Sequence, residues 1–405
     1  MSTRSWAVSL ALLSSLVLCS CDRRTPLSPQ VLSTPTTDRA LAAGGADAKL
    51  VVGPQHEEGE LGPGALYAID IPENWNGDLV LWLHGYTPAE AAVALPSVQL
   101  RAFLLSQGFA VAASSFSENG YVVAEGTRQS HQLLGLFASR FGQPRHMFLL
   151  GVSLGGGIGV KMAETYGPQI DGALLVSGVY GGTRAEVDYV GDIRVLWDYF
   201  FPGSIPGSLF EVPAGTPFNP AWVVGAISTA HGQQKFATFL AFAAARGMRF
   251  QLSGNEPVLA TLNALGFQWM GAMDLFDRTH GHVLYENRNV VYTAPGVPQS
   301  VIDAVNAGVA RYESTPDAEA FMRQNYEPNG KLDMPVLTLH GMRDPAVPAF
   351  HSDLYAAKVV SQGKSDLLVS RKKDKFGHVV YDATDIPLAF LDLVKWVKVG
   401  TKPAV

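Results

Sequence analysis

The stretch Gly-Val-Ser-Leu-Gly-Gly-Gly at residues 151–157 constrains the fold more than any other part of the chain. A largely apolar run at 146–150 leads into it, and a helix-compatible stretch at 158–166 leads out of it. This order predicts a strand, a sharp turn with Ser153 at its apex, and a helix. Such a turn needs glycine at 151 and 155, since a Cβ at either position would collide with the neighbouring strand or helix.

The chemistry that this turn favours depends on partners found later in the chain. A serine hydroxyl is a poor nucleophile at neutral pH and needs a base, which an acid holds in the right tautomer. Asp344 and His378 follow Ser153 in that order, each just past an expected strand, where sites in open parallel sheets are built. A simpler possibility is a glycine-rich turn with Ser153 as a helix N-cap, because the chain contains 41 glycines.

The composition is that of a globular protein with room for a large core. The chain has 405 residues, of which 47% are hydrophobic and 16% charged. The formal charge of −6 is spread without long runs of one sign, so nucleic acid is not an expected partner. The only cysteines are Cys19 and Cys21, which excludes a disulfide, a cysteine metal site and a thiol nucleophile from the rest of the chain.

The first 21 residues have the pattern of an export signal. Arg4 supplies the positive start, and residues 6–18 form an apolar run, interrupted only by serines, that is too short to span a bilayer. Leu18-Cys19-Ser20-Cys21 resembles the bacterial lipobox, which implies lipid attachment at Cys21 and a place in the cell envelope, in the periplasm or at the outer surface. Cys19 stands where a small residue is usual, so lipidation at Cys19, or ordinary cleavage and secretion, stay open.

Short apolar runs alternate with helix-compatible segments in the first part of the folded chain. Residues 22–48, rich in Ser, Thr, Pro, Ala and Gly, predict a flexible tether before it. Alternation at this spacing predicts a mostly parallel sheet with helices on both faces. Strands are expected at 65–71, 79–83, 109–116, 146–150 and 173–178, and helices at 96–107, 127–141 and 158–166.

The alternation breaks between residues 179 and 333. This insertion contains an alanine-rich helical stretch at 233–246 and many aromatic residues between Trp197 and Trp269. We expect a largely helical cap over Ser153, although the aromatic residues could instead fill the core of an independent domain. The alternation resumes with strands at 334–341 and 366–370 and a closing helix at 386–398, so the first domain would combine residues 49–178 and 334–405.

These features together resemble the α/β-hydrolase fold, an α/β architecture with a mostly parallel central sheet and the chain order nucleophile, acid, histidine. The motifs that carry the resemblance fall in the family's order: the loop Leu83-His84-Gly85-Tyr86, the elbow at 151–155, the loop from Leu339 to Asp344, and Gly377-His378. The family carries its cap where the insertion occurs. The resemblance implies acylation of Ser153, a base at His378 oriented by Asp344, and no cofactor.

The resemblance also implies roles for the residues around the nucleophile. The backbone N–H groups of Leu154 and Tyr86 would stabilise the oxyanion, and His84 would brace the oxyanion loop. Asp374, Asp382 and Asp385 compete with Asp344 as the acid, but only Asp344 directly follows a strand. His280 and His282, near Asp274 and Asp277, could suit a metal, although a polar loop is favoured and no metal is predicted.

The aromatic insertion favours a small-molecule ester, with an apolar or aromatic acyl group, as the substrate. A serine peptidase of the same fold is the main alternative, because Gly156 after the elbow also occurs in related peptidases. A non-catalytic, surface-anchored binding protein is a third hypothesis. The intact order of Ser153, Asp344 and His378 speaks against it, since a scaffold freed from catalysis has no physical need of all three.

Overall fold

The computed structural model describes residues 54–213, 215–325 and 327–405. The expected export signal at 1–21, with Cys21, and the expected tether at 22–48 therefore lie outside the described residues. Within the described part of the chain, no helix is both long and apolar enough to cross a membrane.

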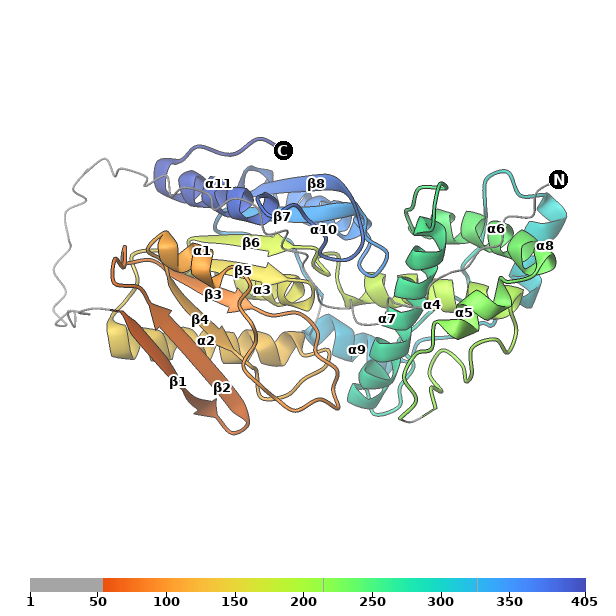
Figure 1. The fold of residues 1–405 in the computed structure, drawn as a ribbon, viewed down its shortest axis with the longest axis horizontal. Helices are drawn as coiled ribbons and strands as arrows, with labels where there is room; N and C mark the ends of the chain where they lie inside the picture. Colours follow the sequence, from red (N-terminus) through yellow and green to blue (C-terminus); the bar gives the residue numbers. More distant parts are fainter. Residues whose placement is uncertain (1–53, 214, 326) are drawn as a thin grey trace, which may run out of the picture.

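Eight strands form one sheet in the order β1-β2-β4-β3-β5-β6-β7-β8 (Figure 1). The six strands from β4 to β8 in this order run parallel, while β2 pairs antiparallel with both β1 and β4. The mostly parallel sheet predicted from the sequence is thus confirmed. The strands are β1 (Gln55–Gly62), β2 (Ala65–Ile71), β3 (Leu79–Leu83), β4 (Ala110–Ser114), β5 (Met147–Val152), β6 (Gly172–Val176), β7 (Val336–Arg343) and β8 (Leu368–Phe376).

Helices cover both faces of the sheet. Successive side chains of a strand point to opposite faces, so Val80 of β3 packs in one cluster with Phe390, and Leu81 packs in the other with Ile158. This two-sided burial explains why β3 is apolar throughout. One face carries α1 (Arg101–Ser106) and α11 (Asp385–Val399), and the other carries α2 (Val123–Phe141), α3 (Leu154–Tyr166) and α10 (Phe350–Ser361).

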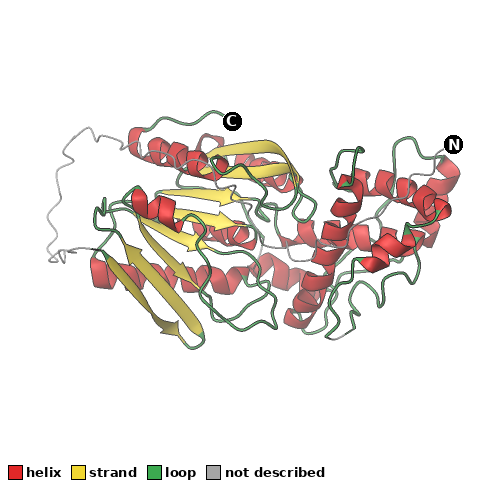
Figure 2. Ribbon diagram, in the orientation of Figure 1, coloured by secondary structure: helices red, strands yellow, loops and turns green. Residues whose placement is uncertain are grey.

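Between β6 and β7, every element of regular secondary structure in the described residues is a helix (Figure 2). Part of its aromatic content fills its own core: Trp197 stacks on Phe201 with ring centroids 4.3 Å apart and meets Phe239 edge-on at 5.3 Å. Its helices are α4 (Thr183–Phe200), α5 (Ala221–Ala226), α6 (Ala230–Ala245), α7 (Glu256–Arg278), α8 (Gln299–Gly308) and α9 (Pro316–Asn325). In Figure 1 this helical part lies beside the sheet, with α7 at the boundary between them.

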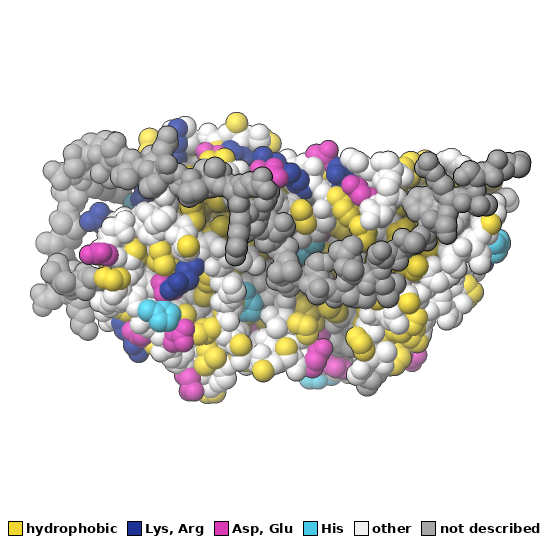
Figure 3. Space-filling view, in the orientation of Figure 1, with side chains coloured by type: hydrophobic (Ala, Val, Ile, Leu, Met, Phe, Trp, Pro, Cys, Tyr) yellow, Lys and Arg dark blue, Asp and Glu magenta, His cyan; other side chains and the backbone are white. Residues whose placement is uncertain are grey.

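The structure differs from the sequence-based expectations mainly at the edges of the sheet. β1 was not expected, and β8 continues to Phe376 instead of ending at 370. Both strands are rich in charged residues because edge strands keep one side in water, where charge also discourages pairing with other chains. Figure 3 shows Lys and Arg side chains gathered over β8. The helix expected at 96–107 is shorter and occupies only Arg101–Ser106.

Candidate active site

Ser153 lies on the turn between β5 and α3 in a backbone conformation that residues other than glycine rarely adopt. Its φ is 57° and its ψ −122°. The flanking glycines are required by close approach: a Cβ on Gly151 would lie 2.2 Å from the oxygen of Gly155, and a Cβ on Gly155 would lie 2.0 Å from the oxygen of Leu83. The turn therefore holds the Ser153 hydroxyl at the end of β5, in front of the first turn of α3.

The structure brings Ser153, His378 and Asp344 together from three distant parts of the chain. Ser153 Oγ lies 2.7 Å from His378 Nε2, and His378 Nδ1 lies 2.7 Å from Asp344 Oδ2. The second oxygen of Asp344 accepts hydrogen bonds from the backbone N–H groups of Ala346 and Val347, both at 3.0 Å. Because the buried carboxylate only accepts, Nδ1 of His378 donates to it, and Nε2 is left to accept the Ser153 proton.

The environment of His378 tunes it as a base. Burial alone would lower the pKa of the imidazole, but the charge of Asp344 and the hydrogen bond to it outweigh burial. The pKa of His378 is therefore raised above its ordinary value of 6.5. An imidazole in this position can take a proton from Ser153 and give it up again.

Each of the competing carboxylates is engaged elsewhere. Asp374 and Asp382 are both largely exposed, whereas Asp344 is fully buried beside His378. Their partners are cations on or beside β8: Asp374 pairs with Arg343, Asp382 with Lys375 and Asp385 with Lys373. Of the four carboxylates weighed from the sequence, Asp344 is the one that bonds to His378.

The loop after β3 packs directly against Ser153. A Cβ on Gly85 would lie 3.3 Å from the Cβ of Ser153, so Tyr86 directly follows a residue that packs against Ser153. His84 holds this loop: its ring stacks on Phe116 with centroids 4.1 Å apart, and its Nδ1 donates to the oxygen of Gly85 at 2.8 Å. Burial lowers the pKa of His84 and keeps the ring neutral, which suits this bracing role.

Helices of the insertion contact the loops that flank Ser153. The hydroxyl of Tyr86 donates a hydrogen bond to the backbone oxygen of Met270 in α7, at 3.2 Å. Tyr189 of α4 donates to the oxygen of Pro345, next to Asp344, at 2.8 Å. The insertion thus contacts both the loop of Tyr86 and the loop that carries Asp344.

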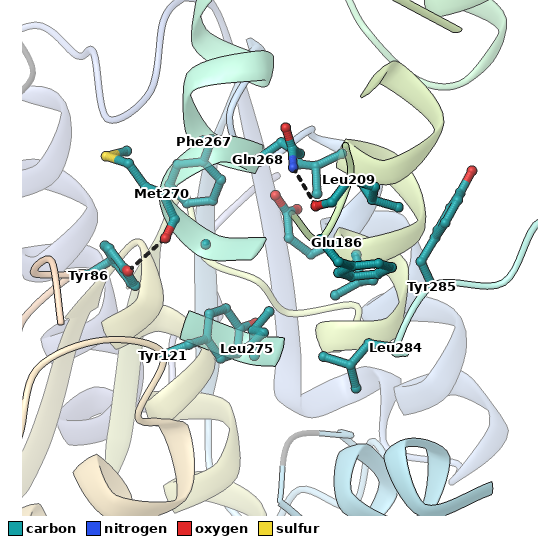
Figure 4. Close-up of a pocket in the computed structure, with 14 residues that line it drawn as sticks. Tyr86, Tyr121, Glu186, Leu209, Phe267, Gln268, Met270, Leu275, Leu284 and Tyr285 are labelled. Carbon is teal, nitrogen blue, oxygen red and sulfur yellow. Dashed lines mark hydrogen bonds between the residues drawn. The ribbon is translucent and has the colours of Figure 1, made fainter. Parts of the chain in front are cut away.

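An apolar cavity lies between α4, α7 and the loop of Tyr86 (Figure 4). Its empty volume is about 580 Å³, counting its opening to solvent. Phe267 of α7 lines the cavity, and its ring centroid lies 6.1 Å from that of His378. The cavity therefore lies next to Ser153 and His378: Tyr86 follows the glycine that packs against Ser153, and Phe267 lies beside the ring of His378.

His280 and His282 were considered from the sequence as possible metal ligands. His282 lies 3.6 Å from the exposed Asp317, while Asp274 bonds to Arg278. Across the described residues, no group of three or more His, Cys, Asp or Glu side chains is arranged to hold a metal ion. Nε2 of the buried His340 donates to the oxygen of Val347 at 2.8 Å, beneath the loop of the acid.

Two residues of this region were missed in the sequence. Glu186 of α4 lines the cavity and is only 3% exposed, and it pairs with the fully buried His351 of α10. No sequence signal distinguishes them. A glutamate is common in the first turn of a helix, and His351, the second residue of α10, belongs to no recognisable motif.

Comparison with solved structures places this architecture in a known fold. An esterase from Aspergillus oryzae superposes with a TM-score of 0.50, at 16% identity, over 84% of this chain and 78% of that chain. Feruloyl esterase B from the same organism gives a TM-score of 0.48, also at 16% identity, over 84% and 78% of the two chains. The chain has the α/β-hydrolase fold.

Sequence comparison adds one distant relative. An o-phthalyl amidase from Xanthobacter agilis is 29% identical over 126 residues, which is 30% of this chain and 26% of the amidase. The match thus spans about a quarter of the amidase. No family model matches the sequence.

Proposed function

We propose that the protein is a serine hydrolase that cleaves carboxylic esters with apolar or aromatic acyl groups. The observation that carries this proposal is the hydrogen-bonded series Ser153–His378–Asp344 beside an apolar cavity. A buried nucleophile, a base and an orienting acid in this geometry are the parts that acyl transfer requires.

The proposed reaction proceeds through an acyl-enzyme. Ser153 Oγ attacks the ester carbonyl while His378 Nε2 takes its proton, and the backbone N–H groups of Leu154 and Tyr86 stabilise the oxyanion. His378 then protonates the leaving alkoxide, and the acyl group stays on Ser153. A water molecule then gives a proton to His378 and attacks the acyl carbon. As the bond between the acyl carbon and Ser153 Oγ breaks, His378 returns this proton to Ser153 Oγ, and the acid is released. Asp344 stays ionised throughout and holds His378 in the productive tautomer.

Amide hydrolysis is the second candidate. The partial sequence match to a protein named as an amidase supports it, because the same serine chemistry cleaves esters and amides. The apolar cavity favours esters over charged peptides, since a charged acyl group would lose its hydration there without a compensating partner. The same cost speaks against a serine peptidase, and the intact series Ser153–His378–Asp344 speaks against a non-catalytic binding protein.

A fluorophosphonate probe and a panel of p-nitrophenyl esters and acyl anilides test the proposal. We expect the probe to label Ser153, and we expect Ser153→Ala to abolish labelling and ester turnover together. Unchanged turnover in Ser153→Ala would remove the serine mechanism. Faster cleavage of amides than of every ester would reverse the order of the two candidates.

We also propose, from the sequence alone, that Cys21 is lipidated and anchors the protein to a membrane of the bacterial envelope. In a bacterial host, Cys21→Ser should move the protein from the membrane fraction to the soluble fraction, and Cys19→Ser serves as the matched control. A wild-type protein that is already soluble, or release by Cys19→Ser alone, would contradict attachment at Cys21.

A further inference from the structure

Glu186 is a buried carboxylic acid in the wall of the apolar cavity. It belongs to the first turn of α4 and is 3% exposed. Figure 4 shows its carboxyl group between Phe267 of α7 and Leu209, pointing into the space that these side chains surround. A carboxyl group in such a place is costly unless it is neutral or paired with a cation.

The partner of Glu186 does not neutralise a charge on it. Nδ1 of His351 accepts a hydrogen bond from the backbone N–H of Gly181 at 3.1 Å, so this nitrogen carries no proton. The proton of the neutral ring is on Nε2, which donates to Glu186 Oε2 at 2.8 Å. Burial lowers the pKa of His351 to about 3, in agreement with a neutral imidazole.

The surrounding charges also favour the protonated form of Glu186. Burial is the main cause that raises the pKa of its carboxyl, and the negative charge of Asp344 raises it further, whereas a protonated His378 would lower it. Among the described residues, no Lys or Arg forms an ion pair with Glu186. Tyr189, one turn further along the same helix, donates its hydroxyl hydrogen bond to the backbone oxygen of Pro345 instead.

The second carboxyl oxygen of Glu186 is left without a hydrogen-bond partner in the described part of the chain. Oε1 is buried and has no hydrogen-bond partner within the described residues. The other polar groups on the cavity wall are engaged: Gln268 donates to the oxygen of Leu209 at 3.0 Å, and Tyr285 donates to Asp192 at 2.6 Å. A protonated Oε1 would therefore be the one unpaired hydrogen-bond donor identified among the described residues beside this apolar cavity.

We propose that Glu186 selects substrates by donating a hydrogen bond from its protonated carboxyl group to an uncharged oxygen in the acyl part of the ester. The substrate class is an ester whose acyl group is largely apolar and carries one keto, ether or amide oxygen away from the scissile carbonyl. This inference rests on the proposed esterase function and adds a specificity residue to it. An ester with such an oxygen gains a hydrogen bond in the complex that an alkyl ester of the same length cannot make.

Matched acyl chains test this selection. The probes are p-nitrophenyl pentanoate, hexanoate and heptanoate, their 4-oxo, 5-oxo and 6-oxo derivatives, and analogues that end in trimethylammonium. We expect the wild type to prefer the keto ester to the alkyl ester of the same length by about 3- to 10-fold in kcat/KM for at least one length. The ratio is taken within one protein preparation, so the fraction of folded protein cancels.

Variants of Glu186 separate a donated hydrogen bond from a charge. Glu186→Gln keeps a donor towards the cavity and an acceptor towards His351, so the preference for the keto ester should survive. Glu186→Leu removes the donor and should bring the ratio to about one. Glu164→Gln is the matched control, because Glu164 is a partly buried glutamate that binds the backbone N–H groups of Asn329 and Gly330, away from the cavity.

Infrared difference spectroscopy tests the protonation state independently of turnover. The spectrum of wild type minus Glu186→Gln should contain the carbonyl stretch of a protonated carboxylic acid, and an absent band would overturn the inference. A keto preference that is missing at every length, or that persists in Glu186→Leu, would also overturn it. A preference for trimethylammonium esters that Glu186→Gln abolishes would show an ionised Glu186. Absence of all ester turnover, with the acid band present, would count against the proposed function instead.

Discussion

The hydroxyl of Tyr189, in the first helix of the insertion, donates a hydrogen bond to the backbone oxygen of Pro345, the residue after Asp344, at 2.8 Å. Both groups are buried, so the bond is protected from water. It joins α4 to the loop that positions the acid, and Glu186 lies one turn earlier on the same helix. This hydrogen bond therefore links the helix that carries Glu186 to the loop that carries Asp344.

The role of Asp344 can be separated from the role of His378 by the size of their effects. If Asp344 only orients His378, Asp344→Asn should lower kcat by about 10⁴-fold, because the amide favours the wrong tautomer. His378→Ala should cost more, about 10⁶-fold. The double variant should cost little beyond His378→Ala alone, since the acid acts through the histidine. Ester turnover measured with purified variants checks all three values.

Asp374→Asn and Asp382→Asn are the controls for this series. Both carboxylates are largely exposed and pair with cations of the β8 region, so each variant should keep most of its activity. Near-normal turnover in Asp344→Asn, with a collapse in either control, would show that the acid is misassigned.

The pH profile should report the raised pKa of His378. The base must be neutral to accept the Ser153 proton, so kcat/KM should fall as the pH drops through this pKa. Although burial acts to lower the pKa, Asp344 raises it above 6.5, and the acid-side inflection should therefore lie above pH 6.5. Asp344→Asn removes the charge and leaves the burial, which should move the inflection to lower pH. An inflection at the same pH in Asp344→Asn would contradict the conclusion that Asp344 raises the pKa of His378.

The contact between α7 and the loop before α2 should stabilise the folded protein. Asp274 accepts from the backbone N–H of Tyr121 at 2.5 Å and pairs with Arg278 at 2.7 Å. Asp274→Asn leaves the largely buried Arg278 short of a counter-charge, so the free energy of unfolding should fall by on the order of 2 kcal/mol.

Glu118→Gln is the control for this pair, because Glu118 also meets Arg278, at 3.3 Å, but is 53% exposed. Its effect should stay below about 1 kcal/mol. Urea denaturation of the three proteins measures the difference. If both variants lower the free energy of unfolding equally, burial of the ion pair does not decide how much it contributes to stability.

The elbow glycines should tolerate no side chain. In Gly155→Ala, the new Cβ would lie 2.0 Å from the oxygen of Leu83. We therefore expect the free energy of unfolding to fall by about 1–3 kcal/mol or more, as is typical of overpacking, and turnover to be lost. Gly135→Ala is the contrast, because a Cβ at this exposed position of α2 meets nothing within 4 Å. It should raise the stability by about 0.5–1 kcal/mol through better helix propensity. Thermal unfolding of both variants checks the two signs.

The local features of this chain were determined by its sequence. β2 and β3 span the residues that their apolar patterns predicted, because strands buried in a sheet need little besides an unbroken or alternating apolar run. The elbow around Ser153 is likewise a local matter, since the collisions that require Gly151 and Gly155 arise within one turn and its neighbouring strand. Chain order then sufficed to nominate Asp344 and His378 as partners.

Tertiary structure decided what local patterns leave open. The edge strand β1 has no apolar signal of its own and is defined only by pairing with β2. Glu186 and His351 could not be predicted for the same reason. Neither stands out in the sequence of its own helix, and they form a pair only because α4 and α10 bring a carboxyl group and a neutral imidazole together. Burial shifts the pKa of such groups, and burial depends on how distant segments pack, which no single stretch of sequence encodes.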